Sequence, residues 1–264
     1  MTSLPPETGM GQRAPASEAL IDVYDRYFEV IDADSPALLE ECHRLRYQVY
    51  VVENTFEDPN EHPGGLERDD FDSHASHCLL VHRPSGAFAG TVRLILPLAD
   101  APGGSFPFQD VCREPVIDDP RRFPALKMGE ISRFSISKRF RQRRTDTMYP
   151  DALDENVGRN PVNGDFRRVI PHMTLGLMEG IIRMCVHNGL SHVCAVMEPQ
   201  LLRLLARVGI RFDPVGPLIE HHGTRQPCFR HLLTLLDEVK ANRPDVWAVM
   251  TKGGQHVEAL LKLE

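Results

Sequence analysis

Residues 128–137, Met-Gly-Glu-Ile-Ser-Arg-Phe-Ser-Ile-Ser, form a run that predicts a largely apolar β-strand with charged residues inside it. Successive side chains of a strand point to opposite faces of its sheet. One face is expected to carry Glu130, Ser132 and Phe134, and the other Ile131, Arg133 and Ser135. Because buried charges need partners, we expect this strand to lie beside other charged groups.

The segments around this strand predict a mixed sheet with helices on its faces. Upstream, the strand-like runs 77–82 and 88–96 flank Arg83-Pro84-Ser85-Gly86, which favours a tight turn and therefore a hairpin. The other expected elements are helix 18–27, strand 28–31, a helix from Ser35-Pro36 to about Val52, helix 169–188 ended by Gly189, strand 192–197, helix 199–208, strand 211–215 and an apolar run 228–236.

The same pattern predicts one domain over residues 17–264, with two long insertions. Connections 97–127 and 138–166 exceed ordinary loop lengths, and connections this long are typical of lids or binding segments. Disorder is the alternative for the second. Residues 1–16 are rich in Pro and Gly and lack a periodic apolar face, which predicts a disordered leader.

Composition excludes several classes of protein. The formal net charge of the 264 residues is -7, which argues against a protein that coats nucleic acid through general basicity. No apolar stretch approaches the roughly 20 residues that cross a bilayer, and residues 1–16 lack the apolar core expected of a secretory signal. The six cysteines form no C-x-x-C pair, which favours reduced thiols and a cytoplasmic location.

Three charged clusters lie in or beside the predicted strands. They are Glu67-Arg68-Asp69-Asp70-Phe71-Asp72, Arg93 within the run 88–96, and Glu130-Ile131-Ser132-Arg133-Phe134. A solvated surface is the ordinary explanation for any one of them alone. Their joint occurrence suggests a network beside a cleft, in which Asp69 and Asp72 pair with Arg46, Arg93 or Arg133.

Four segments in this order resemble the signature of acyl-homoserine-lactone synthases. They are Arg46-Tyr47-Gln48-Val49-Tyr50, Glu67 to Asp72, Gly90-Thr91-Val92-Arg93-Leu94, and Glu130 to Phe134. The length and Pro-rich insertions look most like the acyltransferases associated with the PEP-CTERM/exosortase system, relatives of N-acyl amino acid synthases. The resemblance implies a GNAT-like (acyl-CoA N-acyltransferase) α/β fold, with a central mixed, mostly antiparallel twisted sheet flanked by helices.

The resemblance also implies transfer of a long-chain fatty acyl group from a thioester to the amine of an amino acid or related small molecule. It assigns catalytic roles to Glu130, Ser132 and Arg133. It assigns substrate binding to Arg46, Asp69, Asp72, Arg93 and Phe134.

An attacking amine must lose a proton, so we expect Glu130 to be the base, with burial raising its pKa. Backbone N–H groups around Phe134 to Ser137 are expected to hold the oxyanion, and no covalent enzyme intermediate is required.

The sequence departs from the relatives in two places. The tryptophan that autoinducer synthases carry after the first motif is absent, because the only tryptophan is Trp247. The R-x-x-G-x-G/A loop, which holds the coenzyme A pyrophosphate in GNAT acetyltransferases, is also absent. A basic patch takes its place, formed by Lys138, Arg139, Arg141, Arg143 and Arg144.

Such a patch on an acidic chain steers anionic partners. We therefore expect acyl carrier protein to dock there and present an acyl-phosphopantetheine thioester, with acyl-coenzyme A as the alternative donor and no permanently bound cofactor. A solvated loop or an RNA contact is the other explanation of the patch.

Two other functions remain open at this stage. One is an acyl-homoserine-lactone synthase, which the mass of the product would distinguish. The other is a non-catalytic acyl-carrier-binding module, which predicts salt-sensitive binding without thiol release. No metal is expected, because His74-Ala75-Ser76-His77-Cys78 and His221-His222 lack identifiable third and fourth ligands.

Overall fold

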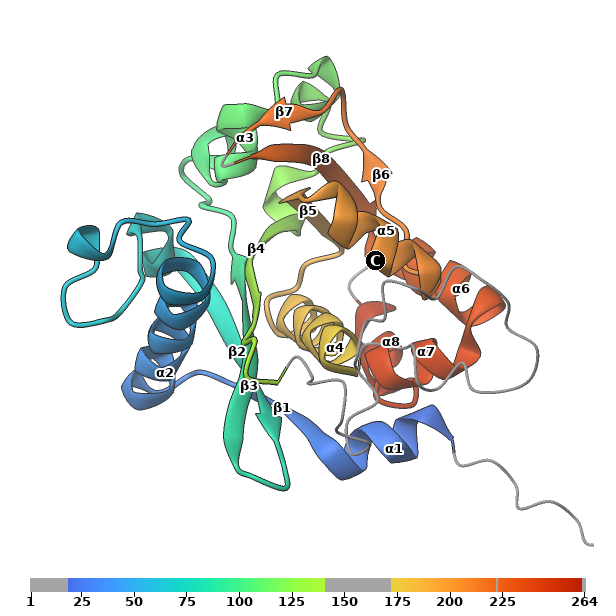
Figure 1. The fold of residues 1–264 in the computed structure, drawn as a ribbon. Coiled ribbons are helices and arrows are strands. Elements are labelled where there is room, and N and C mark those ends of the chain that lie inside the picture. Colours follow the sequence, from blue (N-terminus) through green and yellow to red (C-terminus); the bar gives the residue numbers. More distant parts are fainter. Residues whose placement is uncertain (1–18, 141–171, 222, 263–264) are drawn as a thin grey trace, which may run out of the picture.

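A computed structural model describes residues 19–140, 172–221 and 223–262 (Figure 1). Its helices are α1 Leu20–Tyr27, α2 Pro36–Tyr47, α3 Pro107–Val111, α4 His172–His187, α5 Pro199–Arg207, α6 Leu232–Asn242, α7 Pro244–Met250 and α8 Gln255–Leu260. Its strands are β1 Phe28–Asp32, β2 Ala75–His82, β3 Ala87–Ile95, β4 Met128–Ile136, β5 His192–Met197, β6 Asp213–Pro214, β7 Ile219–Glu220 and β8 Thr224–His231.

The strands follow the order β1-β2-β3-β4-β5-β8-β6, and β7 pairs with β8. Among the described residues, every strand pair is antiparallel except β4 with β5. The expected mixed, mostly antiparallel sheet is therefore confirmed.

Local chemistry explains where the first long helix and the hairpin form. The Ser35 hydroxyl caps α2 by accepting a hydrogen bond from the Leu38 N–H at 3.3 Å, and Pro36 occupies the first helical position. After α2 the chain continues as a π-helical turn, Gln48–Glu53. In the turn between β2 and β3, Gly86 has a φ of 67°, a conformation that favours glycine.

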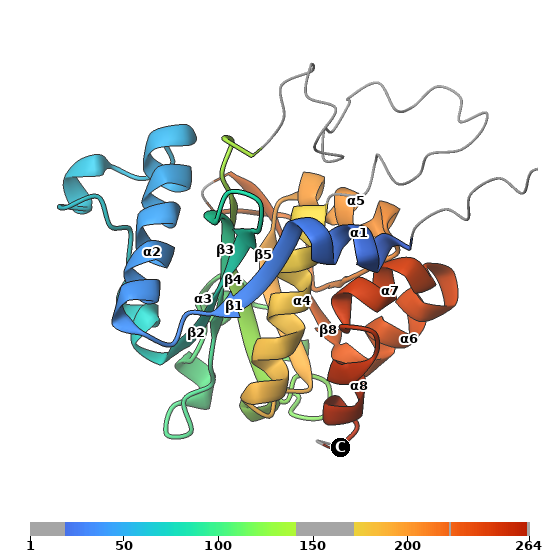
Figure 2. The same ribbon diagram turned by 90° about the horizontal axis from the view of Figure 1, so that it is seen from below.

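The two faces of the sheet carry different layers (Figure 2). Helix α4 packs across β1 to β4 on one face, and α7 and α8 pack against α4. Helix α2 covers β2 to β4 on the opposite face, and α3 contacts β5. The main apolar core thus lies around α4, while the α2 face receives the charged motifs.

Helix α4 approaches the sheet closely because it presents two glycines to β2. A Cβ atom on Gly176 would lie 2.6 Å from Leu80 Cδ1, and one on Gly180 would overlap Cys78 Sγ. The apolar residues of α4, among them Met173, Leu177, Ile181 and Met184, are buried in the main core. The close packing leaves little freedom to shift α4 relative to the strands.

Strands β4 and β5 separate halfway along their length. They pair in parallel only where residues 128–131 of β4 lie beside 192–195 of β5. Farther along β4, the register with β3 passes from Arg93–Ser132 to Thr91–Ser135, so Arg133 and Phe134 form a bulge opposite Val92. Arg133 has a φ of 51°, which is uncommon for a residue with a side chain.

The C-terminal part differs from the sequence prediction. The apolar run 228–236 is not one element, because β8 ends at His231 and α6 begins at Leu232 with His231 as its N-cap. Of the expected strand 211–215, Asp213–Pro214 forms β6 and pairs with β8, and the Val215 N–H donates to Pro227 O of β8 at 2.8 Å. Helices α7 and α8 were not predicted. The expected leader 1–16 and residues 141–166 of the second insertion lie outside the described residues.

No helix in the described ranges is both long and apolar enough to span a bilayer.

We predict that Gly180→Ala destabilises the protein by about 1–3 kcal/mol, because the added methyl group overpacks the contact with Cys78. Alanine has a better helix propensity than glycine by roughly 1 kcal/mol, so propensity alone predicts the opposite sign. Urea unfolding of the variant measures the change. Gly104→Ala is the control, because a Cβ there meets nothing within 4 Å. A Gly180→Ala protein as stable as wild type contradicts the packing argument.

Candidate functional site

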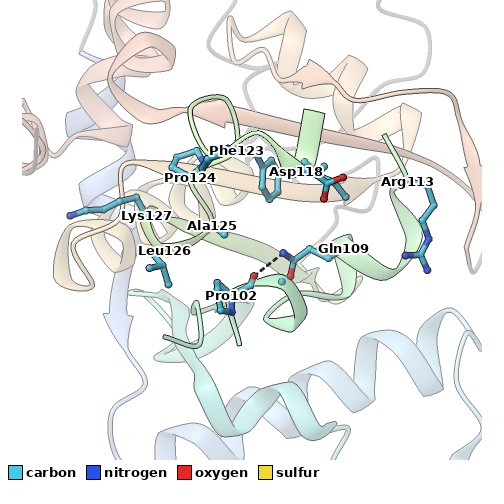
Figure 3. A pocket seen from close by; sticks show the side chains of 12 residues that line it. Pro102, Gln109, Arg113, Asp118, Phe123, Pro124, Ala125, Leu126 and Lys127 are labelled. Carbon is cyan, nitrogen blue, oxygen red and sulfur yellow. Dashed lines mark hydrogen bonds between the residues drawn. The ribbon is translucent and has the colours of Figure 1, made fainter. Parts of the chain in front are cut away.

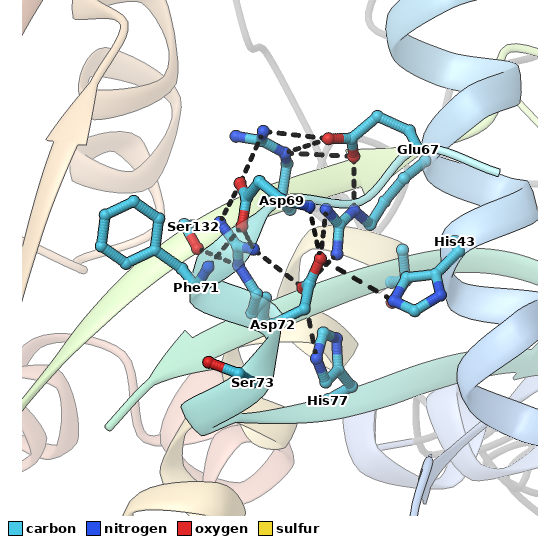
Figure 4. Close-up of polar contacts among 12 residues, drawn as sticks. His43, Glu67, Asp69, Phe71, Asp72, Ser73, His77 and Ser132 are labelled. Atoms are coloured by element: carbon cyan, nitrogen blue, oxygen red, sulfur yellow. Dashed lines mark hydrogen bonds and ion pairs between the residues drawn. The ribbon is translucent and has the colours of Figure 1, made fainter. Parts of the chain in front are cut away.

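Three arginines and three carboxylates meet between α2, the turn 67–74 and strands β3 and β4. We call this set the charged ring. Its members are Arg46, Arg93, Arg133, Glu67, Asp69 and Asp72. Figure 4 shows Glu67, Asp69 and Asp72 close together, with dashed lines from their carboxylates to the side chains drawn around them. Segments far apart in the sequence are thereby joined on one face of the sheet.

Arg46 anchors the α2 side of the charged ring. Its Nε donates to Glu67 Oε2 at 2.5 Å, and its two terminal nitrogens donate to the two oxygens of Asp72 at 2.6 and 3.2 Å. Arg46 is fully buried and Glu67 is 1% exposed. The helix is therefore fixed to the turn by a charged, two-sided contact rather than by apolar packing alone.

Arg93 connects the turn to β4. Its terminal nitrogens donate to Asp69 at 2.5 and 3.0 Å and to Asp72 at 2.8 Å, and its Nε donates to the Ser132 hydroxyl at 2.9 Å. Arg133 completes the ring with hydrogen bonds to Glu67 and Asp69 at 3.0 to 3.1 Å. The expected pairing of Asp69 and Asp72 with these arginines is confirmed.

The turn itself explains the spacing of the acidic motif. Asp69 Oδ1 accepts from the Phe71 N–H at 3.0 Å, and the Asp69 N–H donates to Asp72 Oδ2 at 2.9 Å. This capping box begins the 3₁₀ turn Asp70–His74. Each aspartate thus uses one oxygen to fix the turn and still presents its carboxylate to the arginines.

The arginines favour the ionised forms of Glu67 and Asp72. Burial by itself would raise the pKa of Glu67, but the hydrogen bonds and charge of Arg46, together with Arg133, outweigh it and lower the pKa to about 2. The pKa of Asp72 is also lowered, because Arg46 and Arg93 outweigh its burial. With equal numbers of positive and negative groups, the ring is neutral as a whole.

Glu130 lies close to the ring but has a different environment. Its side chain is 4% exposed, and its Oε2 accepts a hydrogen bond from the Phe108 N–H at 2.8 Å. Burial raises the pKa of Glu130 to about 7, although the Phe108 N–H and the charges of Arg93 and Arg133 act in the opposite direction. Such a carboxyl exchanges a proton near neutral pH.

Glu130 lines a cavity of about 330 Å³, here called the central pocket. Tyr50 and Phe71 lie on the α2 side of its wall, and Val196 and Arg225 come from β5 and β8. Asp69, Arg93, Ser132 and Arg133 also line it. The fully buried Arg46 supports this wall from behind and is not part of the lining.

The expected alternation along β4 is wrong from Arg133 onward. Arg133 joins Ser132 on the charged face, whereas Phe134 packs against the main core on the α4 face. The bulge at Arg133 is the physical reason, because it inserts one extra residue and shifts the phase of the strand. Phe134 therefore lies apart from Glu130 and Ser132, with which it was grouped.

The basic patch is described only in part. Lys138 and Arg139 are exposed, and the Lys138 ammonium and N–H both bond to Glu53, at 2.6 and 2.9 Å. Arg141, Arg143 and Arg144 lie outside the described residues.

Sequence reasoning missed several parts of this site. Glu67 was quoted in its motif but not selected, although a glutamate that heads an acidic turn is a signal for pairing with Arg46. Tyr50, also within a quoted motif, lies 5.4 Å from the Arg133 guanidinium and stabilises it by a cation–π contact. The Phe108 N–H and Arg225 had no local signal, because only the fold brings the first to Glu130 and the second into the lining of the central pocket.

Two groups in the described part of the chain have potential metal ligands close together: His43, Asp72 and His77, and Glu57, Glu61 and His62. Both oxygens of Asp72 already accept hydrogen bonds from arginines, so a cation would lie beside two guanidinium groups. The second group lies on a loop where Glu61 is exposed. Neither arrangement favours a metal.

Insertion 97–127 also forms a larger cavity of about 570 Å³ (Figure 3). Among the residues that line it are Pro102, Gln109, Arg113, Phe123 and Leu126. This cavity and the central pocket have no lining residue in common. Nothing in its lining resembles the base and charged ring of the central pocket.

We predict that Glu67→Gln destabilises the protein by about 3–5 kcal/mol, because it leaves Arg46 buried with one partner removed. Glu40→Gln is the matched control. Glu40 pairs with Arg44, but both side chains are about half exposed, so the loss is expected to stay below about 1 kcal/mol. Urea unfolding of both variants tests the difference, and equal losses would contradict a structural role for the charged ring.

The comparisons with known proteins agree with this architecture. A family model described as an acetyltransferase (GNAT) domain matches residues 45–150. TofI, in a ternary complex with an inhibitor and MTA, has a TM-score of 0.53 at 16% identity, with 81% of this chain and 96% of that chain covered. BjaI, a CoA-dependent acyl-homoserine lactone synthase with SAM and isopentyl-CoA, has a TM-score of 0.52 at 20% identity, covering 85% and 98%.

FeeM, an N-acyl amino acid synthase from uncultured soil microbes, has a TM-score of 0.48 at 12% identity, covering 81% of this chain and 97% of that chain. A search of curated protein sequences gives no match. At 16% and 20% identity, the similarity to TofI and BjaI establishes the fold. The reaction has to be argued from the residues of the site. The chain has the fold of a GNAT domain.

Proposed function

We propose that this protein is an N-acyltransferase that moves a long-chain acyl group from a phosphopantetheine thioester to the amino group of an amino acid or related small amine. One observation carries the proposal: Glu130, a carboxyl with a pKa of about 7, lines a pocket beside the point where β4 and β5 separate. A GNAT fold with a buried base at this position is suited to acyl transfer onto an amine.

In the proposed reaction, the acceptor reacts as the neutral amine, after its ammonium form has released one proton to solvent, and Glu130 takes a second proton from the nitrogen as the nitrogen attacks. The amine nitrogen attacks the thioester carbonyl carbon and forms a tetrahedral intermediate with a negative oxygen. The carbon–sulfur bond then breaks, the amide remains, and the proton held by Glu130 is returned to the leaving thiolate. No covalent bond to the enzyme is needed. Glu130 acts first as the base toward the amine and then as the acid toward the leaving thiolate.

The bulge in β4 is the proposed place for the tetrahedral oxygen. Phe134 has no residue paired with it on β3, and the pairing with β5 ends at Ile131. Its N–H is therefore our candidate donor, preorganised by the strand. The expectation for Ser137 is wrong, because the Ser137 N–H donates to Ala89 O at 3.1 Å.

The remaining candidate residues receive supporting roles in this proposal. Ser132 holds Arg93, and Arg93 and Arg133 hold Asp69 at the pocket wall. Arg46 and Asp72 keep the wall rigid from behind. Phe134 packs against the main core on the α4 face of the bulge, and we propose that it contacts the acyl chain there.

For the donor, we propose acyl carrier protein. The support is the basic patch, of which Lys138 and Arg139 are exposed at the end of β4. Arg141, Arg143 and Arg144 are proposed to extend it. An anionic carrier steered to this position would deliver its thioester next to the separation of β4 and β5.

Incubating the purified protein with long-chain acyl carrier protein and pooled amino acids tests the proposal. We expect thiol release together with a lipid whose mass is that of an N-acyl amino acid. A product with the mass of an acyl-homoserine lactone, formed when the pool includes a suitable precursor, would identify the alternative enzyme. Salt-sensitive carrier binding without thiol release would identify the non-catalytic module.

We predict that Glu130→Gln lowers kcat/KM by about 100-fold or more at pH 8, because the amine loses its proton acceptor. In wild type, kcat/KM should fall as pH decreases through about 7, since protonated Glu130 is no longer a base. This limb should be absent in Glu130→Gln.

Glu57→Gln is the control, because Glu57 lines the same pocket and its loss should leave the limb near pH 7 in place. Burial opposes the charged form of Glu130, so the glutamine variant should unfold no earlier than wild type at pH 8. Unchanged single-turnover transfer by Glu130→Gln would remove Glu130 from the role of base.

A further inference from the structure

We infer that Arg225 binds the carboxylate of the acceptor, so that the central pocket selects amino acids over amines that lack a carboxylate. This inference rests on the proposed function, because it assigns a partner to the acceptor molecule of that reaction. It is carried by the position of Arg225 relative to Glu130 and by the bonding of the other cations in the pocket.

Arg225 and Glu130 belong to the same face of the sheet. Glu130 is aligned with Cys194 of β5, and Cys194 with Phe229 of β8. Cys194 and Phe229 pack in the apolar cluster on this face. Arg225 lies four residues from Phe229, an even spacing that returns its side chain to the same side.

This placement leaves room for a small molecule between the two side chains. Arg225 is two strands across from Glu130 and four residues along, which corresponds to about 10 Å and about 13 Å between backbone positions. The guanidinium and the carboxyl both line the central pocket, and each has a different partner, Glu198 for Arg225 and the Phe108 N–H for Glu130. An acceptor that contacts both must carry two polar groups.

The other two arginines of the pocket are committed to the charged ring. Arg93 donates to Asp69, Asp72 and Ser132, and Arg133 donates to Glu67 and Asp69. These contacts join the turn 67–74, helix α2 and strands β3 and β4. An anion that bound Arg93 or Arg133 would have to replace hydrogen bonds that hold the wall of the pocket in place. The ring is therefore poorly suited to bind an anionic substrate.

Arg225 has a weaker attachment. Its guanidinium forms an ion pair with Glu198 at 3.1 Å, and Glu198 is 45% exposed and is not part of the pocket lining. An exposed carboxylate of this kind contributes little to stability. A substrate carboxylate can share or replace this contact without disturbing the fold, while the planar guanidinium supplies two parallel donors.

An amino acid matches this arrangement because it carries both an ammonium group and a carboxylate. With its carboxylate on Arg225, its nitrogen faces the side of the pocket where Glu130 accepts a proton. The carboxamide of the same amino acid keeps the nitrogen but loses the negative charge. In this arrangement, Arg225 determines the preference for the amino acid over its carboxamide, and Glu130 carries out the proton transfer.

A competition experiment tests this directly. Each of the twenty common amino acids is mixed in equal amounts with its own carboxamide, and the two acylated products are quantified by mass, with long-chain acyl carrier protein as donor. The product ratio equals the ratio of the two kcat/KM values. We expect wild type to favour the acid by about tenfold or more, as loss of a charged hydrogen-bonded pair implies.

Three variants make the result specific. Arg225→Gln should abolish the preference by lowering kcat/KM for the acid, mainly through KM, while transfer to the amide is retained. Arg225→Lys should keep part of the preference, because it retains the charge without the planar pair of donors. Arg203→Gln, an exposed arginine on α5, is the control and should keep the wild-type ratio.

The outcomes separate the inference from the proposed function. Acylation of amines with the same acid-to-amide ratio in wild type and Arg225→Gln would overturn the role of Arg225 and leave the acyltransferase intact. No acylation of either compound by wild type would overturn the proposed function. If Arg225→Gln is inactive on both compounds, the ratio measured for Arg225→Lys decides, and a wild-type ratio there overturns the inference.

Discussion

The neutralisation of three arginines by three carboxylates is the interaction on which the rest of this site depends. Arg46 and Arg93 are almost fully buried, and a buried charge is tolerated only with partners that satisfy its hydrogen bonds. Glu67, Asp69 and Asp72 supply those partners from one short turn. These contacts fix helix α2, the turn and strands β3 and β4 relative to one another. They thereby also fix the wall of the central pocket, which Asp69, Arg93 and Arg133 line.

The charged ring also explains why Glu130 differs from its acidic neighbours. Glu67 and Glu130 are both buried, yet the pKa of Glu67 is lowered to about 2 and that of Glu130 is raised to about 7. The arginines nearest to Glu130 donate to the ring carboxylates, so burial dominates at Glu130. Because the ring carboxylates accept the hydrogen bonds of Arg93 and Arg133, Glu130 has no arginine partner among the described residues and can exchange a proton near neutral pH.

Much of this arrangement could be predicted from the sequence, because it depends on local patterns. Strand periodicity and turn residues located the β2–β3 hairpin and β4, and the acidic turn carries its own capping pattern in Asp69 and Asp72. The side on which Arg133 lies could not be predicted, because the bulge leaves no mark in the residue pattern and reverses the alternation. Only the tertiary fold brings the Phe108 N–H to Glu130 and Arg225 into the central pocket, so no spacing rule reveals them.

The central claim is that Glu130 is protonated and deprotonated near neutral pH while Glu67 and Asp72 remain ionised. An infrared pH titration of the carboxylic acid C=O stretch, taken as the difference between wild type and Glu130→Gln, measures this most directly. The account predicts a band that is present at pH 5 and disappears with a midpoint near pH 7. If the difference spectrum shows no carboxylic acid band at pH 5, Glu130 is ionised like its neighbours and the account is wrong.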